Sequence, residues 1–124
     1  MTGLRVLVVD DSLLTIKRIS AMLAELGHET VATAGTGNQA VAAYAESRPD
    51  IVTMDIVMPD MNGIDATRLI VEKHPHARII IVTSHGQERM VVDSLAAGAK
   101  GYVMKPIKPE RLADMLTKVM DGRP

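Results

Sequence analysis

The fold of this chain is decided by one stretch, Ile51-Val52-Thr53-Met54-Asp55-Ile56-Val57-Met58-Pro59-Asp60-Met61-Asn62-Gly63. Its first four residues form an apolar run that predicts a buried strand. The later Pro, Asp, Asn and Gly residues favour a turn, because they fix φ, form local hydrogen bonds or tolerate positive φ. Asp55 is therefore expected at the carboxyl end of a buried strand, the edge at which open α/β sheets bind ligands.

On either side of this stretch, strand-like and helix-like segments alternate along the whole chain. Short apolar runs predict strands at residues 4–9, 28–33, 51–54, 78–82 and 100–104. Helical spacing of apolar residues, with capping and stop signals, predicts helices at residues 13–26, 38–46, 63–74, 87–97 and from Pro109 onward. Strict alternation predicts a single α/β domain, residues 1–124, whose parallel sheet is covered by helices on both faces.

Composition excludes several classes of function. Of the 124 residues, 47% are hydrophobic and 23% charged, which is typical of one globular domain. The net charge of -1 gives no overall field that would attract nucleic acid or anionic lipid. There is no cysteine for a disulfide or a thiolate metal site, and no apolar stretch of membrane-spanning length. Since a signal-peptide pattern is also missing, we expect a cytoplasmic protein.

Charged and hydroxyl side chains follow four of the five predicted strands. Asp10 and Asp11 follow the first strand, Asp55 the third, Thr83 ends the fourth, and Lys105 follows the fifth. Three carboxylates about 4–6 Å apart would repel one another by roughly a few kcal/mol per pair, and one lysine neutralises only part of this charge. A divalent cation can neutralise the rest. Oxygen ligands without Cys or clustered His favour Mg²⁺, for which Mn²⁺ could substitute.

A carboxylate beside a cation suits phosphoryl transfer. Aspartate is an accepted covalent nucleophile for phosphoryl groups, which makes Asp55 the candidate acceptor. The transition state spreads charge over the equatorial phosphoryl oxygens, which the metal, Lys105 and the Thr83 hydroxyl could hold. Each residue alone has an ordinary structural explanation, such as a loop cap or a solvated lysine. Their joint occurrence at the mouth of the sheet favours a site.

The motifs that carry this chemistry resemble the receiver domain of bacterial response regulators over essentially the whole chain. They are Val8-Val9-Asp10-Asp11-Ser12, Met54-Asp55, Met58-Pro59-Asp60-Met61-Asn62-Gly63, Val82-Thr83-Ser84, Ala97-Gly98-Ala99 and Tyr102-Val103-Met104-Lys105-Pro106. The resemblance implies a flavodoxin-like strand order 2-1-3-4-5 with five helices. That order is the known order of the family's chemotaxis regulator and does not follow from the residues themselves.

The resemblance also implies roles at the site. Asp55 would be phosphorylated by a histidine kinase. Asp11, Asp55 and the Val57 backbone carbonyl would ligate Mg²⁺ directly, and Asp10 would act mainly through water. Lys105 would bind a phosphoryl oxygen and precede a cis bond to Pro106.

Four further positions are expected to shape the response to phosphorylation. Thr83 would move toward the phosphate and Tyr102 would report that movement to a partner, through the helix at 87–97, the last strand and the last helix. Val57 and His85 would flank the path of attacking water and so tune the phosphoryl lifetime. Ile107 stands where the family usually has Phe, which changes packing under the last helix but no chemistry.

We therefore expect a phospho-accepting signalling switch of a two-component system, similar to the single-domain chemotaxis type. It would catalyse only its own phosphorylation and dephosphorylation. Its expected partners are a histidine kinase and an output protein, and it would be a monomer that could dimerise on phosphorylation. A phosphatase of the haloacid dehalogenase type would need an Asp-x-Asp pattern, but position 12 is Ser. A flavodoxin would need a phosphate loop where two carboxylates stand. A receiver-like scaffold that acts without phosphorylation stays open.

Overall fold

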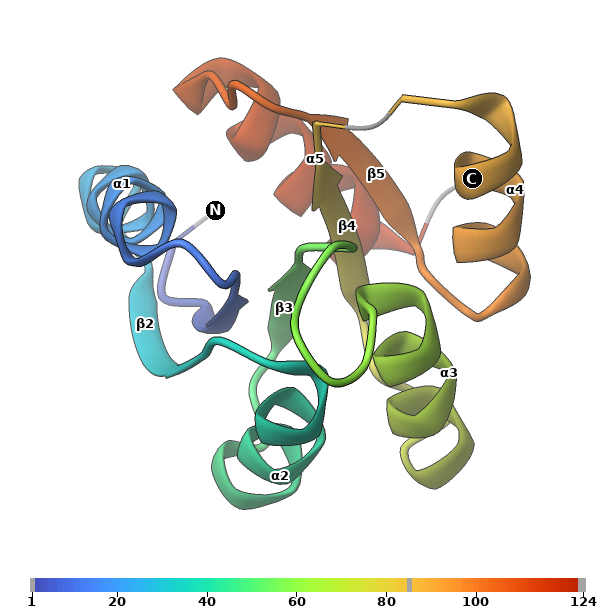
Figure 1. Cartoon of the computed structure of the whole chain (residues 1–124). Helices are drawn as coiled ribbons and strands as arrows, with labels where there is room; N and C mark the ends of the chain where they lie inside the picture. The colour runs from blue at the N-terminus through green and yellow to red at the C-terminus, as the bar shows by residue number, and fades with distance from the viewer. Residues whose placement is uncertain (1, 85, 123–124) are drawn as a thin grey trace.

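The computed structural model describes residues 2–84 and 86–122 of the chain. Strands and helices alternate through these residues, as Figure 1 shows. The strands are β1 (Arg5–Val9), β2 (Glu29–Ala34), β3 (Ile51–Met54), β4 (Ile79–Thr83) and β5 (Gly101–Met104). The helices are α1 (Leu13–Glu25), α2 (Gly37–Ser47), α3 (Gly63–Lys73), α4 (Glu88–Ala96) and α5 (Pro109–Asp121).

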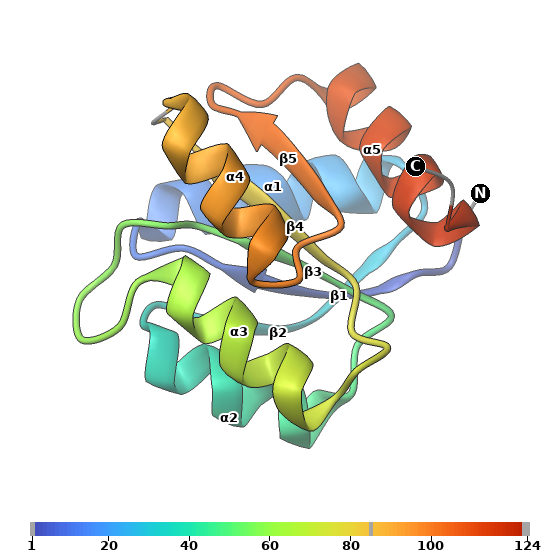
Figure 2. The ribbon, with the colours of Figure 1, turned by 90° about the vertical axis from the view of Figure 1, so that its right-hand side faces the viewer.

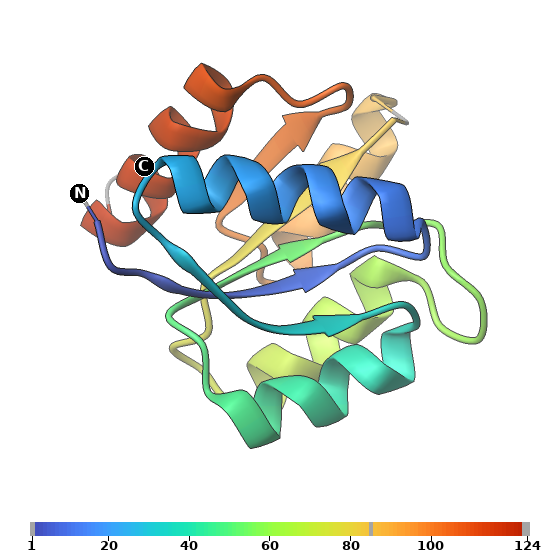
Figure 3. The ribbon, with the colours of Figure 1, turned by 90° about the vertical axis from the view of Figure 1, so that its left-hand side faces the viewer.

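The strands form one parallel sheet in the order β2-β1-β3-β4-β5. Two hydrophobic clusters lie on its two faces: α1 and α5 cover one, and α2, α3 and α4 cover the other (Figures 2 and 3). The flavodoxin-like α/β fold predicted from the sequence, including the strand order and the covered faces, is therefore confirmed. Because every strand runs the same way, their carboxyl ends share one edge of the sheet.

Two of the three inner strands of the sheet, β3 and β4, explain the apolar runs in the sequence. Every residue of β3 and β4 is buried, since helices cover both faces of the sheet and neighbouring strands flank both sides. The edge strands β2 and β5 each keep exposed or half-buried positions. Strand β3, which Asp55 directly follows, is thus packed against neighbouring elements on all sides.

Local contacts set the ends of the first helix and the second strand. The Ser12 hydroxyl caps α1 by accepting a hydrogen bond from the backbone N–H of Thr15 at 3.3 Å. The second strand begins at Glu29, one residue later than expected, because the His28 backbone N–H donates to the Leu23 carbonyl oxygen at the end of α1 at 2.8 Å. The His28 side chain is buried. Its Nδ1 accepts a hydrogen bond from the backbone N–H of Leu4 at 3.2 Å. His28 therefore links the turn before β2 to the start of β1.

Helix α4 is the least anchored of the helices. Its N-cap residue, Gln87, forms no side-chain capping hydrogen bond, and Ser94 is the one fully buried residue among the described residues of the helix. Val92 and Leu95 are more than half exposed on its surface. The helix consequently contributes little to the core and leaves an apolar surface uncovered.

Candidate functional site

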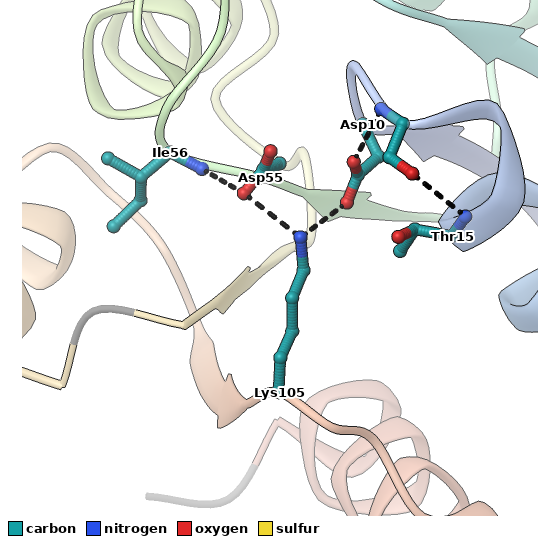
Figure 4. Close-up of polar contacts among 6 residues, drawn as sticks. Asp10, Thr15, Asp55, Ile56 and Lys105 are labelled. Atoms are coloured by element: carbon teal, nitrogen blue, oxygen red, sulfur yellow. Dashed lines mark hydrogen bonds and ion pairs between the residues drawn. The ribbon is translucent and has the colours of Figure 1, made fainter.

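The predicted site residues meet at the carboxyl edge of the sheet. Asp10 follows β1, Asp55 follows β3 and Lys105 follows β5 (Figure 4). The Lys105 Nζ atom donates a hydrogen bond to Asp10 Oδ2 at 2.7 Å and lies 3.4 Å from Asp55 Oδ1. Residues separated by 95 and 50 positions along the chain are thus brought together by the parallel strand ends.

Three carboxylates form a cluster that fits a divalent cation. One oxygen each from Asp10, Asp11 and Asp55 lies within 4.8 Å of the other two. Asp10 and Asp55 are buried, whereas Asp11 is exposed at the rim of the site. Mg²⁺ in proteins is usually held by oxygen ligands, one or two carboxylates together with waters, and a cation here would relieve the repulsion among the three carboxylates.

Asp55 is held in an environment that disfavours its negative charge. Burial and, after it, the Asp10 charge raise the pKa of the Asp55 carboxyl to about 6 against the opposing effect of Lys105. Its Oδ1 accepts a hydrogen bond from the backbone N–H of Ile56 at 3.0 Å. For Lys105, burial lowers the pKa, but the hydrogen bond to Asp10 and the Asp55 charge outweigh it, so the pKa is raised. The lysine therefore stays positive beside the carboxylates.

A close backbone approach fixes the position of Asp55. The backbone N–H of Gly63, the first residue of α3, donates to the Ile56 carbonyl oxygen at 2.8 Å. A Cβ atom added at Gly63 would collide with the backbone oxygen of Asp55. Sequence reasoning marks Gly63 as a turn residue and misses this contact. A glycine at the start of a helix is the signal that could have indicated it.

Asp60 connects the loop after β3 to the start of α2. It has positive φ, 65°, and its carboxylate accepts hydrogen bonds from the backbone N–H groups of Gly37 at 3.0 Å and Asn38 at 3.3 Å. Burial raises the pKa of Asp60, but the hydrogen bonds from Met61 and Asn38 outweigh it, so the pKa is lowered. The sequence predicts a turn here but not this second cap for α2, which holds the loop that carries the site.

The two expected switch residues lie on neighbouring strands. Thr83 is fully buried at the end of β4 and pairs in register with Met104 of β5. Its backbone oxygen accepts a hydrogen bond from the Lys105 N–H at 2.8 Å. Tyr102 is half-buried on β5 and packs against the cluster beneath α2, α3 and α4, where burial raises its pKa. Their proposed movement stays a prediction.

The structure describes some of the remaining expected positions but not all of them. Val57 is 54% exposed, two residues beyond Asp55, and the roles of its side chain and its carbonyl stay predictions. His85 lies outside the described residues. The Lys105–Pro106 peptide bond is cis, as the resemblance implies. None of the helices that the structure describes combines the length and apolar character needed to cross a membrane.

A family model, "Response regulator receiver domain", matches residues 6–117. The chain is 44% identical to the chemotaxis protein CheY of Thermotoga maritima over 117 residues, covering 94% of this chain and 98% of that protein. It is 42% identical to CheY of Bacillus subtilis over 117 residues, with the same coverage of each. A crystal structure of the CheX-CheY-BeF3-Mg complex from Borrelia burgdorferi matches with a TM-score of 0.92 and 35% identity. That match covers 95% of this chain and 90% of the other. With its acidic cluster, lysine and strand order in place, this chain belongs to the response regulator receiver domain family.

Proposed function

We propose that the protein is a phosphorylation-dependent switch in which Asp55 accepts a phosphoryl group from a histidine kinase. The observation that carries this proposal is the position of the Asp55 carboxylate between Lys105, 3.4 Å away, and the Asp10 and Asp11 carboxylates. The protein would catalyse only its own phosphorylation and dephosphorylation. The full set of acceptor, acidic cluster and lysine argues against a scaffold that never uses phosphate.

The geometry suits a direct transfer to the carboxylate. With a pKa of about 6, Asp55 is mostly ionised at neutral pH. One of its oxygens would bond to phosphorus as the bond between phosphorus and the kinase histidine nitrogen breaks. Lys105 would hold a phosphoryl oxygen. Bound Mg²⁺, held by Asp10, Asp11, Asp55 and the Val57 carbonyl, would supply positive charge beside the phosphoryl oxygens, with Mn²⁺ as a substitute.

Exposed apolar side chains near Asp55 provide a surface to which the phosphoryl donor could bind. Leu13 and Leu14 are 67% and 59% exposed at the start of α1, directly after the acidic pair. A cavity of about 290 Å³ lies next to them and includes Arg18, Ser84 and Lys105 in its wall. Apolar side chains exposed beside a cavity are typical of a protein-binding surface. We assign this surface to the kinase domain that carries the phosphohistidine.

The output surface would lie on α4, β5 and α5. Phosphorylation of Asp55 adds anionic oxygens that the Thr83 hydroxyl can approach with a charge-assisted hydrogen bond. Movement of Thr83 would change the packing of Tyr102, which lies on the adjacent strand. Val92, Leu95 and Met104 expose apolar side chains over α4 and β5, where a partner could bind. The CheY relatives and the CheX-CheY complex support a chemotaxis pathway for this output.

Phosphorylation by acetyl phosphate tests the proposal. Intact-mass spectrometry should show one added phosphoryl group when Mg²⁺ is present and none when EDTA removes it. The Asp55→Asn variant, which keeps the size of the side chain, should not be labelled. Equal labelling with and without Mg²⁺, or labelling of Asp55→Asn, would refute the assigned acceptor and metal roles.

A further inference from the structure

A second cavity, of about 370 Å³, lies at the opposite edge of the sheet from Asp55. It is formed by the carboxyl ends of α2 and α3 and by the segment that leads into β4. Its wall consists of Tyr44, Arg48, Pro49, Lys73, His74, Pro75, His76 and Ala77. The volume is in the range of pockets that hold small molecules. None of the residues assigned to phosphoryl transfer contributes to it.

The cavity concentrates positive charge that no carboxylate balances. Arg48, Lys73 and two histidines line it, and no lining residue is acidic. Among residues 2–84 and 86–122, no ion pair involves Arg48, Lys73 or the nearby Arg78. The whole chain has a net charge of -1, so this local excess of cations does not follow from its composition. An unbalanced cluster of cations in a concave site favours an anion.

Tyr44 contributes an aromatic ring and a hydroxyl group to the wall of this cavity. The residue as a whole is 8% exposed, but its hydroxyl oxygen reaches solvent, since it is not one of the buried polar atoms that lack a partner among the described residues. Burial raises the pKa of this hydroxyl, while the charges of Arg48 and Arg78 act to lower it. The ring packs against His74 with centroids 4.8 Å apart. A ligand oxygen in the cavity could accept a hydrogen bond from the Tyr44 hydroxyl in place of water.

The backbone that carries Arg48 is fixed in place. Arg48 has the left-handed conformation at φ 46°, and its N–H donates to the Tyr44 carbonyl oxygen at 2.9 Å. Its own carbonyl oxygen accepts a hydrogen bond from Arg5 Nη1 at 2.7 Å, and Arg5 Nη2 donates to the Ser47 carbonyl oxygen at 2.7 Å. The arginine therefore projects from an anchored turn, which lowers the cost of ordering it around a ligand.

We propose that this cavity binds a small molecule that carries a phosphate monoester. The planar guanidinium group of Arg48 matches phosphate oxygens, and Lys73 and the Tyr44 hydroxyl supply further donors from the same wall. A neighbouring cavity of about 580 Å³ shares Pro75 and His76 and adds Arg78, Lys100 and Lys118 to the basic surface. A ligand with a second anionic group could extend into it. The site acts separately from phosphorylation at Asp55 and does not depend on that proposal.

Titration calorimetry with AMP, pyrophosphate and inorganic phosphate tests this site. EDTA should be present throughout, so that no divalent cation draws phosphate to Asp55, and the ionic strength should be kept constant with chloride. We expect saturable binding by at least one probe. Arg48→Gln should weaken it by about tenfold or more, and Tyr44→Phe by a smaller factor, because charge-assisted hydrogen bonds are the stronger ones. Arg111→Gln, an equal change of charge in the first turn of α5, should leave it unchanged.

Several results would overturn the proposal. One is no saturation by any of the three probes, and another is equal weakening by Arg48→Gln and Arg111→Gln, which would indicate a nonspecific charge effect. Sedimentation with vesicles containing phosphatidic acid separates a lipid headgroup from a small molecule as the source of the phosphate. Binding to vesicles without binding to any soluble probe would refute the small-molecule assignment. A thermal unfolding curve of each variant shows whether it is folded at the titration temperature.

Discussion

The two ends of the same parallel sheet carry opposite charge. At the carboxyl end, three carboxylates gather around one lysine, and burial opposes the charge of Asp55. At the amino end, arginines, lysines and histidines line two cavities without a carboxylate among the lining residues. A net charge of -1 conceals this separation. The interior between the ends is apolar, so we propose that each end is matched from outside, by a cation at the carboxyl end and by an anion at the amino end.

The largest expected effect is on phosphorylation, which should require Asp55 at the carboxyl end of the sheet but not Arg48 at the amino end. Asp55→Asn should abolish phosphorylation by acetyl phosphate, because it removes the nucleophilic oxygen, whereas Arg48→Gln should be labelled like the wild type. Intact-mass spectrometry over time measures both. Slower labelling of Arg48→Gln than of Arg111→Gln would show that the two ends are coupled, which would contradict their independence.

The next largest effect is on the free energy of unfolding and arises at the carboxyl end of the sheet. Gly63→Ala should destabilise the fold by about 3 kcal/mol, because its Cβ would collide with the Asp55 backbone oxygen and displace the loop. Gly35→Ala is the matched control. A Cβ there would meet only ordinary contacts, and its cost should be within about 0.5 kcal/mol. Urea unfolding of both variants provides the measurement, and equal stability would disprove the close approach.

A smaller effect concerns pH at the carboxyl end. The folded-state pKa of Asp55, about 6, lies above its usual value of 3.8, so folding favours the protonated carboxyl. Without a divalent cation, stability should therefore fall as the pH rises from about 4 through 6. Asp55→Asn should be the more stable protein at pH 7.5, by about 1–3 kcal/mol, with the difference vanishing near pH 4. A difference that does not change with pH would show that the carboxylate charge is not its cause.

The smallest effect has the opposite sign and belongs to His28, near the start of β1. Burial lowers the pKa of His28, and its Nδ1 must be unprotonated to accept the hydrogen bond from Leu4. The stabilisation by neutral His28 is therefore fully present above pH 6.5, the usual pKa of histidine. It is lost as the pH falls below that value. Replacing His28 with Gln should flatten the decline in stability between pH 7 and pH 5.5. An unchanged decline in thermal unfolding would assign it to other groups.

Much of the carboxyl end could be predicted from the sequence, because local signals recur at the ends of four of the five strands. A buried run followed by Asp55, an acidic pair after the first strand and a lysine before Pro106 mark positions that a parallel sheet must bring together. The cap that Asp60 provides for α2 could not be predicted. It depends on how two loops pack, and no local pattern encodes this.

The cavity around Tyr44 could not be predicted for the same reason. Its cations lie near the ends of α2 and α3 and before β4, where each alone looks like an ordinary solvated residue. Only the packing of α2 against α3 brings them to one place. The same limit applies to Gly63: its position at the start of a helix is visible in the sequence, whereas its contact with the Asp55 backbone requires the loop conformation.

The complete burial of β3 has a consequence for local opening. Amide groups in a strand that is covered on both faces exchange with solvent only when large parts of the structure unfold together. Helix α4, with one buried residue and no side-chain cap, can open at much lower cost. Amide exchange in α4 should therefore be far faster than in β3. If α4 carries the proposed output surface, a partner could reshape it many times while Asp55 stays anchored to slowly exchanging β3.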